Sequence, residues 1–273
     1  MSARNVRVAG HFGEVMQGRI GPGGPVALIT LPCPVLGVTA RLLPGAGLTL
    51  SKASAGIMPK ARAVKLLAGL GISLTGQVDF SAEMPPGGGA GVSTAALVAL
   101  ARLAGWQGDP LALARTCVAV EGASDPLMLP APMQLLWASR RAEVLETLSP
   151  PPLMEVIGGF YGPPRRTDPG DTDFPDIADL IPLWRAACAA GDLAAVAELA
   201  SRSAQRRLAQ TKAQSDPTLS LAADLGALGH VIAHTGAARG LIFAPGAVPA
   251  RARAALQAAG LRGVVQFLAG GRV

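Results

Sequence analysis

The sequence predicts an α+β protein with two lobes, on the strength of three observations. Strand-like alternation and helix-like spacing of apolar residues occur in both halves of the chain. Residues 149–176 are rich in Pro, Gly and Asp, which indicates a domain boundary near residues 148–152. The C-terminal half has too few strand patterns for a doubly wound sheet. We therefore expect one domain over residues 1–150 and a second over residues 151–273.

The N-terminal half is expected to contain both strands and helices. The predicted strands cover residues 5–10, 25–42, 48–53 and 76–85, and the predicted helices cover 59–71, a segment starting near Ser93, and 109–122. Pro32 and Pro34 are expected to break the second segment into separate strands, because proline lacks a backbone N–H. The helix near Ser93 is apolar on nearly all sides, so we expect it to be central and buried.

The C-terminal half is expected to be mainly helical. One short strand is predicted at 153–162, followed by helices at 176–191, 192–212 and 216–229. A turn then leads into a strand at 240–245, and a helix at 249–260 and a strand at 263–270 complete the pattern. Asp192 and Asp216 are good helix N-caps, which supports the second and third of these helices.

Composition and charge narrow the class of protein. The formal net charge is +6, but the basic residues are dispersed and no aromatic residues alternate with them. This pattern suits a small anionic substrate and argues against a nucleic-acid partner. Cys33, Cys117 and Cys188 lie among apolar neighbours without a CxxC spacing, which is typical of free, buried thiols in a reducing compartment. Without a signal-like or membrane-spanning segment, we expect a soluble cytoplasmic protein with no membrane partner.

The segment "PPGGGAGVST", residues 85–94, follows a predicted strand and precedes the predicted central helix. Glycines allow successive N–H groups to point into one concavity, and a helix N-terminus adds unpaired donors and about half a positive charge. A phosphate chain is the natural ligand of such a site. Neither GxxxxGK[ST] nor a complete GxGxxG pattern is present, so a plain connecting turn remains an alternative.

Two carboxylates and a hydroxyl are expected close to this loop. If the helices near Ser93 and at 109–122 pack antiparallel, Glu121 and Asp125 return to the loop. A hydroxyl and a carboxylate suit Mg²⁺, which completes its coordination with water and nucleotide phosphates. Asp125 is placed to orient or deprotonate an alcohol. The alternatives are a simple N-cap role for Ser93 and a surface charge at Glu121.

Two further Gly-containing segments carry polar residues next to strands, where binding sites are common. The segment "GHFGEVMQG" contributes His11, Glu14 and Gln17, and "AHTGAARG" contributes His234, Thr235 and Gly236. A histidine in such a turn is more often a structural hydrogen-bonding group than a catalytic one, so that alternative remains open for His234.

Taken in order, these segments resemble the GHMP kinase superfamily. Within it they are most similar to the L-threonine kinases of cobalamin biosynthesis, the propanediol-utilisation protein family. Residues 85–94 resemble the loop P-x-x-x-G-[LIM]-[GAS]-S-S-[AT], with Ala90 and Val92 as departures from it. The segments "AGHFGEVMQG", "VEGASDP", "SRSAQRRLAQTK" and "AHTGAARGL" resemble the family's xCGELxQG, Glu-x-x-x-Asp, SAxxSQR and AHSGxxxGL motifs.

The resemblance implies a two-domain GHMP kinase fold. Its N-terminal ATP-binding domain would be ribosomal protein S5 domain 2-like, and its C-terminal domain would be ferredoxin-like. ATP would lie on the loop residues Pro86, Gly87, Gly88, Gly89, Ala90, Gly91, Val92, Ser93 and Thr94. Mg²⁺ would bind Ser93 and Glu121, and with Asp125 these residues would form the catalytic set.

The resemblance also implies a substrate and a reaction. The acceptor would be a hydroxy amino acid, with L-threonine converted to O-phospho-L-threonine. Candidate acceptor-binding residues are His11, Glu14, Gln17, His234, Thr235 and Gly236. Arg206 or Arg239 would suit the acceptor carboxylate. A kinase for another small alcohol such as homoserine, and a nucleotide-binding protein without catalysis, remain the alternatives.

Overall fold

The structure is a computed structural model that describes residues 4–165, 168, 170–171, 173–211, 216–234 and 236–271. The strands are β1 (Arg4–Arg19), β2 (Val26–Leu43), β3 (Leu48–Leu50), β4 (Gly76–Ala82), β5 (Leu135–Ala138), β6 (Glu143–Thr147), β7 (Met154–Phe160), β8 (Gly229–Ile232), β9 (Ala238–Phe243) and β10 (Arg262–Ala269). The helices are α1 (Lys60–Gly69), α2 (Val92–Leu103), α3 (Pro110–Glu121), α4 (Leu180–Ala190), α5 (Leu193–Thr211), α6 (Thr218–Leu225) and α7 (Ala252–Ala258).

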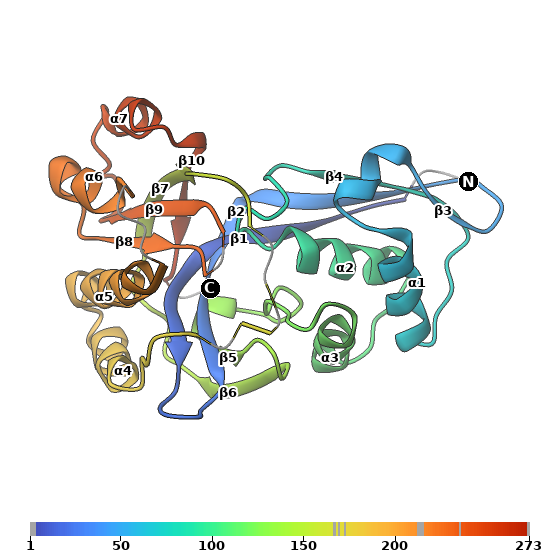
Figure 1. The fold of residues 1–273 in the computed structure, drawn as a ribbon, viewed down its shortest axis with the longest axis horizontal. Helices are drawn as coiled ribbons and strands as arrows, with labels where there is room; N and C mark the ends of the chain where they lie inside the picture. Colours follow the sequence, from blue (N-terminus) through green and yellow to red (C-terminus); the bar gives the residue numbers. More distant parts are fainter. Residues whose placement is uncertain are drawn as a thin grey trace.

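The described strands form one sheet whose main path runs β10-β7-β9-β8-β1-β2-β4-β3, with β5 pairing β2 and β6 pairing β5. Strands from both predicted domains therefore share the sheet, and Glu14 of β1 lies opposite Ile232 of β8 where the two sets join. Helices α1, α2 and α3 lie toward one end of the molecule and α4 to α7 toward the other (Figure 1). The α+β fold class is confirmed, and the division at residue 150 stays a prediction.

Strands β1 and β2 are long and pair along most of their length (Figure 1). The prediction that Pro32 and Pro34 break β2 is wrong: β2 is continuous through both residues. Strand β4 pairs with Val38–Leu43 and β5 with Leu28, so the prolines fall between these two stretches. A register shift between Ala9 and Gly10 of β1 leaves Pro34 outside the β1–β2 pairing, whereas Pro32 keeps its place opposite His11.

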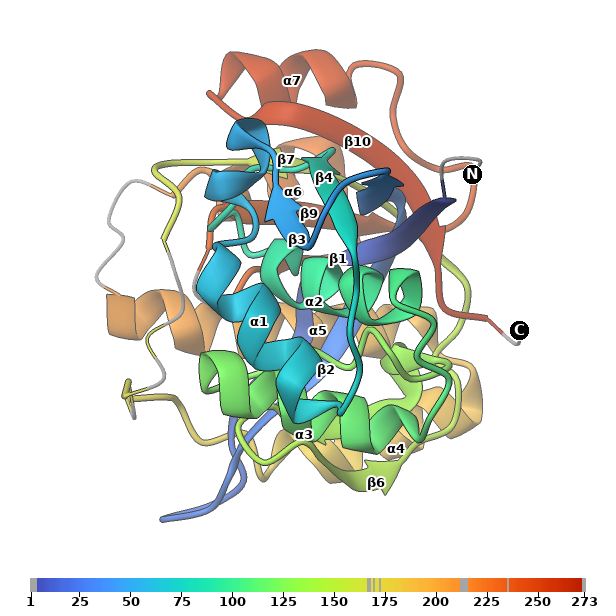
Figure 2. The same cartoon turned by 90° about the vertical axis from the view of Figure 1, so that its right-hand side faces the viewer.

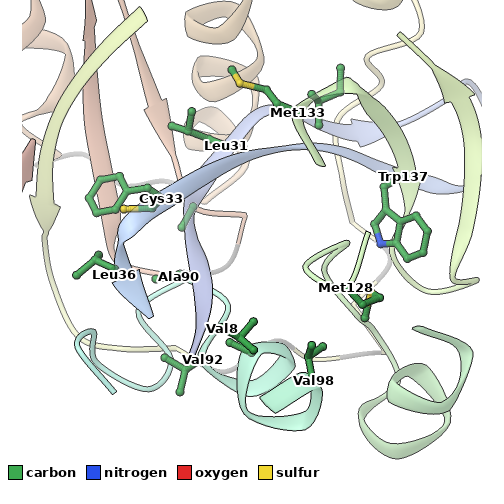
Figure 3. Close-up of a cluster of buried hydrophobic side chains, with 14 of the residues drawn as sticks. Val8, Leu31, Cys33, Leu36, Ala90, Val92, Val98, Met128, Met133 and Trp137 are labelled. Carbon is green, nitrogen blue, oxygen red and sulfur yellow. The ribbon is translucent and has the colours of Figure 1, made fainter. Parts of the chain in front are cut away.

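Helix α2 is buried on nearly all sides, as its composition predicts. It packs on β1 and β2, and it lies in front of β1 in Figure 2. Helix α5 packs on β1 and β8. Figure 3 shows Val8 of β1 between Val92 and Val98 of α2 in this core, and Met128 and Trp137 belong to the same cluster. The Trp137 Nε1–H donates to the Ser124 carbonyl at 2.6 Å. This bond fixes the chain just after α3, where Asp125 lies.

The predicted helices and the predicted state of the cysteines are confirmed, whereas some short strands were missed. Helices are present near all the predicted ranges, and the three cysteines are free and buried. Asp109 caps α3 through the N–H groups of Leu111 and Ala112, as expected. The hairpin β5–β6 and the short strand β8 were not predicted. Across the residues that the structure describes, no helix combines the length and the apolar character needed to cross a bilayer.

Candidate active site

One cavity brings together most of the predicted site residues. Its empty volume is about 1080 Å³, part of it open to solvent. The cavity is lined by the loop residues from Pro86 to Thr94 other than Gly88, by His11, Glu14, Glu121, Asp125 and His234, and by residues near the start of α1. The predicted phosphate-binding loop and three of the acceptor candidates, His11, Glu14 and His234, therefore share one space.

The loop before α2 requires glycine at alternate positions. Gly87, Gly89 and Gly91 have φ angles of 77°, 73° and 74°, in the left-handed region that other L-residues rarely adopt. A side chain on Gly91 would also place its Cβ 2.5 Å from Cδ2 of His11. The alternate glycines that identified the loop in the sequence are thus required by the left-handed backbone conformation at these positions.

The second glycine turn lies directly on the first. The N–H groups of Ala237 and Ala238 both donate to the Gly88 carbonyl at 2.9 Å. A Cβ on Gly236 would come within 2.2 Å of the Gly89 nitrogen, so only glycine allows the two turns to touch. Gly88 and Gly236 therefore serve the contact between the turns, and neither lines the cavity.

Helix α2 begins without a side-chain cap. Its N-cap residue is Gly91, so Ser93 is not the N-cap that one alternative proposed. The first-turn N–H groups of α2 therefore receive no hydrogen bond acceptor from an N-cap side chain. Val92, which replaces a serine of the kinase motif, turns its side chain into the core and is 6 % exposed (Figure 3). Ala90 is also buried, and both residues belong to the hydrophobic core while also lining the cavity.

Ser93 and Glu121 meet, as the antiparallel packing of α2 and α3 predicts. The Ser93 hydroxyl donates to Oε1 of Glu121, and the guanidinium of Arg62 on α1 donates to the same carboxylate oxygen. Arg62 Nη1 also lies 3.2 Å from the Ser93 Oγ. Burial raises the pKa of Glu121, while the Ser93 hydrogen bond and the Arg62 charge oppose that shift.

His11 links two acidic residues that also line the cavity, Glu14 and Asp125. Its Nε2 lies 3.3 Å from Oδ2 of Asp125, and its Nδ1 lies 3.6 Å from Oε1 of Glu14. Glu14 accepts the backbone N–H of His234 at 2.8 Å, and the Asp125 backbone N–H donates to the Thr94 hydroxyl at 3.2 Å. The group thus joins β1, α2, the segment after α3 and the second glycine turn.

The charges of His11, Glu14 and Asp125 depend on one another. Burial lowers the pKa of His11, but the charge and hydrogen bond of Asp125, with Glu14, outweigh burial and raise the pKa to about 9. Burial raises the pKa of Glu14 to about 7. Burial also acts to raise the pKa of Asp125, yet the His11 charge leaves it below its usual value. At neutral pH the arrangement is an imidazolium facing an ionised Asp125.

His11, Glu14 and Asp125 place ligand atoms within 4.8 Å of one another, a geometry that also suits a metal ion. The imidazolium already supplies the positive charge between the two carboxylates. Mg²⁺ prefers an all-oxygen shell. Ser93 and Glu121 therefore fit Mg²⁺ better than the histidine cluster does.

His234 is enclosed by cationic and aromatic groups. Its ring stacks on Phe174 at 4.3 Å between centroids, and the guanidinium carbons of Arg207 and Arg140 lie 4.7 and 5.3 Å from the Phe174 centroid. Burial and the two arginine charges lower the pKa of His234 to about 3, so the ring is neutral at physiological pH. Phe174 belongs to no motif and was missed by the sequence analysis, whereas Arg207 lies in the segment "SRSAQRRLAQTK" but was not assigned to the site.

The remaining predicted residues lie outside the cavity. Gln17 is fully buried and donates from Nε2 to the Ile232 carbonyl, so it joins β1 to β8. Arg206 pairs with Asp179, and Arg239 pairs with Asp216. Both guanidinium groups, which were candidates for the acceptor carboxylate, are thus engaged by carboxylates of the protein itself. Thr235 lies outside the described residues. The expected loop position of His11, Glu14 and Gln17 is wrong, because all three belong to β1.

Comparison with known proteins supports the fold. No protein-family model matches the sequence, and no curated protein matches it. Among solved structures, Streptococcus pneumoniae phosphomevalonate kinase has a TM-score of 0.65 at 13% identity, over 99% of this chain and 100% of that chain. Homoserine kinase from Cytophaga hutchinsonii has a TM-score of 0.59 at 16% identity, over 98% and 95%. A 4-(cytidine 5'-diphospho)-2C-methyl-D-erythritol kinase has a TM-score of 0.59 at 22% identity, over 99% and 100%.

These structural neighbours are GHMP-family kinases, and the chain has their two-domain fold over nearly its whole length. The predicted fold is therefore confirmed. At these identities the likeness concerns the fold alone.

Proposed function

We propose that this protein is an ATP-dependent kinase that phosphorylates the hydroxyl group of a small molecule. The observation that carries the proposal is the contact between Ser93 and Glu121 beside the glycine loop, in the same cavity as Asp125. A polyphosphate site, a hydroxyl–carboxylate pair and a second carboxylate are the parts that phosphoryl transfer to an alcohol requires.

The loop residues would bind the nucleotide. Backbone N–H groups at residues 87–93 would donate to the β- and γ-phosphates, helped by the positive end of α2. Ser93 and Glu121 offer the oxygen ligands that Mg²⁺ accepts. Bound Mg²⁺ would offset negative charge on the phosphates.

Asp125 would act on the acceptor hydroxyl. Its carboxylate would accept the hydroxyl proton as the alcohol oxygen bonds to the γ-phosphorus and ADP leaves. His11 would keep Asp125 ionised and fix its orientation, since the imidazolium contacts Oδ2 directly. His11 is thus a positioning residue in this scheme rather than a ligand of the acceptor.

The acceptor that we propose is L-threonine, giving O-phospho-L-threonine, as the sequence resemblance to cobalamin-biosynthesis kinases suggests. The buried Glu14 carboxylate lines the same cavity and suits an ammonium group. Homoserine is the second candidate, because a homoserine kinase is among the structural neighbours.

ADP release with an acceptor panel tests this function. Purified protein is given MgATP with L-threonine, L-serine, L-homoserine or mevalonate, and ADP is measured by a coupled assay. We expect threonine-dependent release above that with the other three acceptors. If ADP release is greatest with homoserine, the proposal that the protein is a kinase stands and homoserine replaces threonine as its acceptor. Release that no acceptor stimulates would favour a nucleotide-binding protein without catalysis.

A further inference from the structure

Arg62 lies at the place where the proposed metal site would form. It is in the first turn of α1, and its guanidinium donates both to the Ser93 hydroxyl, at 3.2 Å, and to Oε1 of Glu121. No motif of the sequence pointed to this arginine. Its side chain is 35% exposed, whereas that of Glu121 is 10% exposed. The arginine therefore approaches from the open side of a nearly buried carboxylate.

The contact occupies atoms that a metal ion on Ser93 and Glu121 would use. A cation coordinated by Ser93 and Glu121 needs the oxygen atoms that Arg62 now engages. Two positive charges a few ångströms apart around one carboxylate repel each other, and solvent screens this repulsion weakly because the Glu121 side chain is only 10% exposed. The guanidinium and a metal ion would therefore compete for Oε1 of Glu121 and for the Ser93 Oγ.

We propose that Arg62 is a further residue of the nucleotide site, whose guanidinium competes with the metal ion for Ser93 and Glu121. This inference rests on the proposed function for its physiological meaning, although the competition itself does not require catalysis. Arg62 also lines the cavity beside the loop, where a displaced guanidinium would be available to the phosphates of a bound nucleotide.

Two consequences follow from competition. First, removing the guanidinium strengthens metal binding. Second, the arginine partly substitutes for the metal when a nucleotide binds without one, because it offers positive charge at the same place. The ratio of nucleotide Kd without Mg²⁺ to Kd with Mg²⁺ therefore depends on Arg62.

The chain offers a matched control on the same helix. Lys65 is three residues further along α1, and its Nζ donates to the Ala119 carbonyl at the end of α3 at 2.5 Å. It thus shares the helix, the sign of charge and the packing partner of Arg62. Lys65→Gln changes the same interface without freeing Ser93 or Glu121.

The first test measures Mn²⁺ binding without nucleotide, by the loss of the free-ion electron paramagnetic resonance signal. Wild type, Arg62→Gln, Arg62→Lys and Lys65→Gln are compared, with a thermal melt to verify folding. We expect Arg62→Gln to bind Mn²⁺ at least about fivefold more tightly than wild type and Lys65→Gln to match wild type. Arg62→Lys keeps the charge and should lie between wild type and Arg62→Gln. Unchanged or weaker Mn²⁺ binding in a folded Arg62→Gln variant overturns the proposal.

The second test measures ADP binding by calorimetry with Mg²⁺ and with EDTA. The Kd ratio should rise about fivefold or more in Arg62→Gln and stay constant in Lys65→Gln. A constant ratio in Arg62→Gln contradicts competition at the nucleotide site. Absence of ADP binding to wild type in both conditions would instead refute the proposed function, while the Mn²⁺ result would still decide the role of Arg62.

Discussion

Nε2 of His11, in the middle of β1, lies 3.3 Å from Oδ2 of Asp125, which follows α3. The histidine is buried, and Glu14 faces its other nitrogen. This pair connects the strand at the centre of the sheet to the carboxylate that we propose as the base. In the function that we propose, its charge state would govern the proton transfer from the acceptor hydroxyl.

The charge of this pair can be read directly by NMR. The chain has three histidines, so imidazole C–H signals are assignable with single His→Gln variants. We expect the His11 signal to titrate near pH 9 and the His234 signal to stay that of a neutral ring down to about pH 3. A titration midpoint near pH 6.5 for His11 would show that Asp125 and Glu14 do not raise its pKa.

The same shift predicts a pH dependence of stability. The pKa of His11 is raised in the folded state, so its contribution to stability is complete below about pH 6.5 and is lost as pH rises through about 9. Between pH 7.5 and 9 the free energy of unfolding should fall by up to about 1.4 kcal/mol per pH unit from this group. Urea unfolding at several pH values measures the slope, and a rising stability over this range contradicts it.

Asp125→Asn should slow catalysis without abolishing nucleotide binding. The amide keeps the shape of the carboxylate but does not accept the hydroxyl proton, so kcat should fall about 10²- to 10⁴-fold. Asp224→Asn, at an exposed position on α6, is the control and should behave as wild type. Equal kcat values for both variants would remove Asp125 from the mechanism.

Glu121→Gln should remove metal-dependent activity while preserving the fold. The substitution deletes a proposed metal ligand but keeps the side-chain volume, and we expect a loss in kcat of at least about 100-fold. Glu146→Gln tests the same chemical change at the exposed pair with Arg185. Activity is measured over a range of Mg²⁺ concentrations, and full activity of Glu121→Gln would mean that another carboxylate holds the ion.

The glycine loop can be tested with two substitutions that share their backbone strain. Gly91 and Gly105 have φ angles of 74° and 85°, so alanine at either position costs about 1–2 kcal/mol. Only at Gly91 does the new Cβ meet His11, because the Gly105 side is open. Gly91→Ala should therefore lose more stability than Gly105→Ala, and should also weaken nucleotide binding. Equal free energies of unfolding would contradict the close contact between loop and strand.

The helices and the glycine loop could be predicted because their signals are local. Alternate glycines, the Asp109 cap and the apolar α2 each follow from a few neighbouring residues. The hairpin β5–β6 escaped prediction because Leu135–Ala138 is buried throughout and shows no alternation. The continuity of β2 through Pro32 depends on which strands pair on each side, and this is a property of the whole sheet.

The residues of the candidate site likewise fall into those that local sequence patterns predict and those that depend on the tertiary fold. Ser93, Glu121 and Asp125 lie close together because two consecutive helices return to the loop, a geometry that sequence spacing predicts. Arg62 and Phe174 could not be found, because each reaches the site from a separate element without a motif. Gln17 shares the polar character of its neighbours but points to β8, and only the strand register reveals that direction.

The most direct measurement is a crystal structure with a non-hydrolysable ATP analogue and Mg²⁺. The account predicts the β- and γ-phosphates against the N–H groups of residues 87–93, and a metal ion about 2.0–2.1 Å from Ser93 Oγ and a Glu121 oxygen. Arg62 should then have left Glu121. A nucleotide bound elsewhere, or a metal ion held by His11 and Glu14 instead, would contradict it.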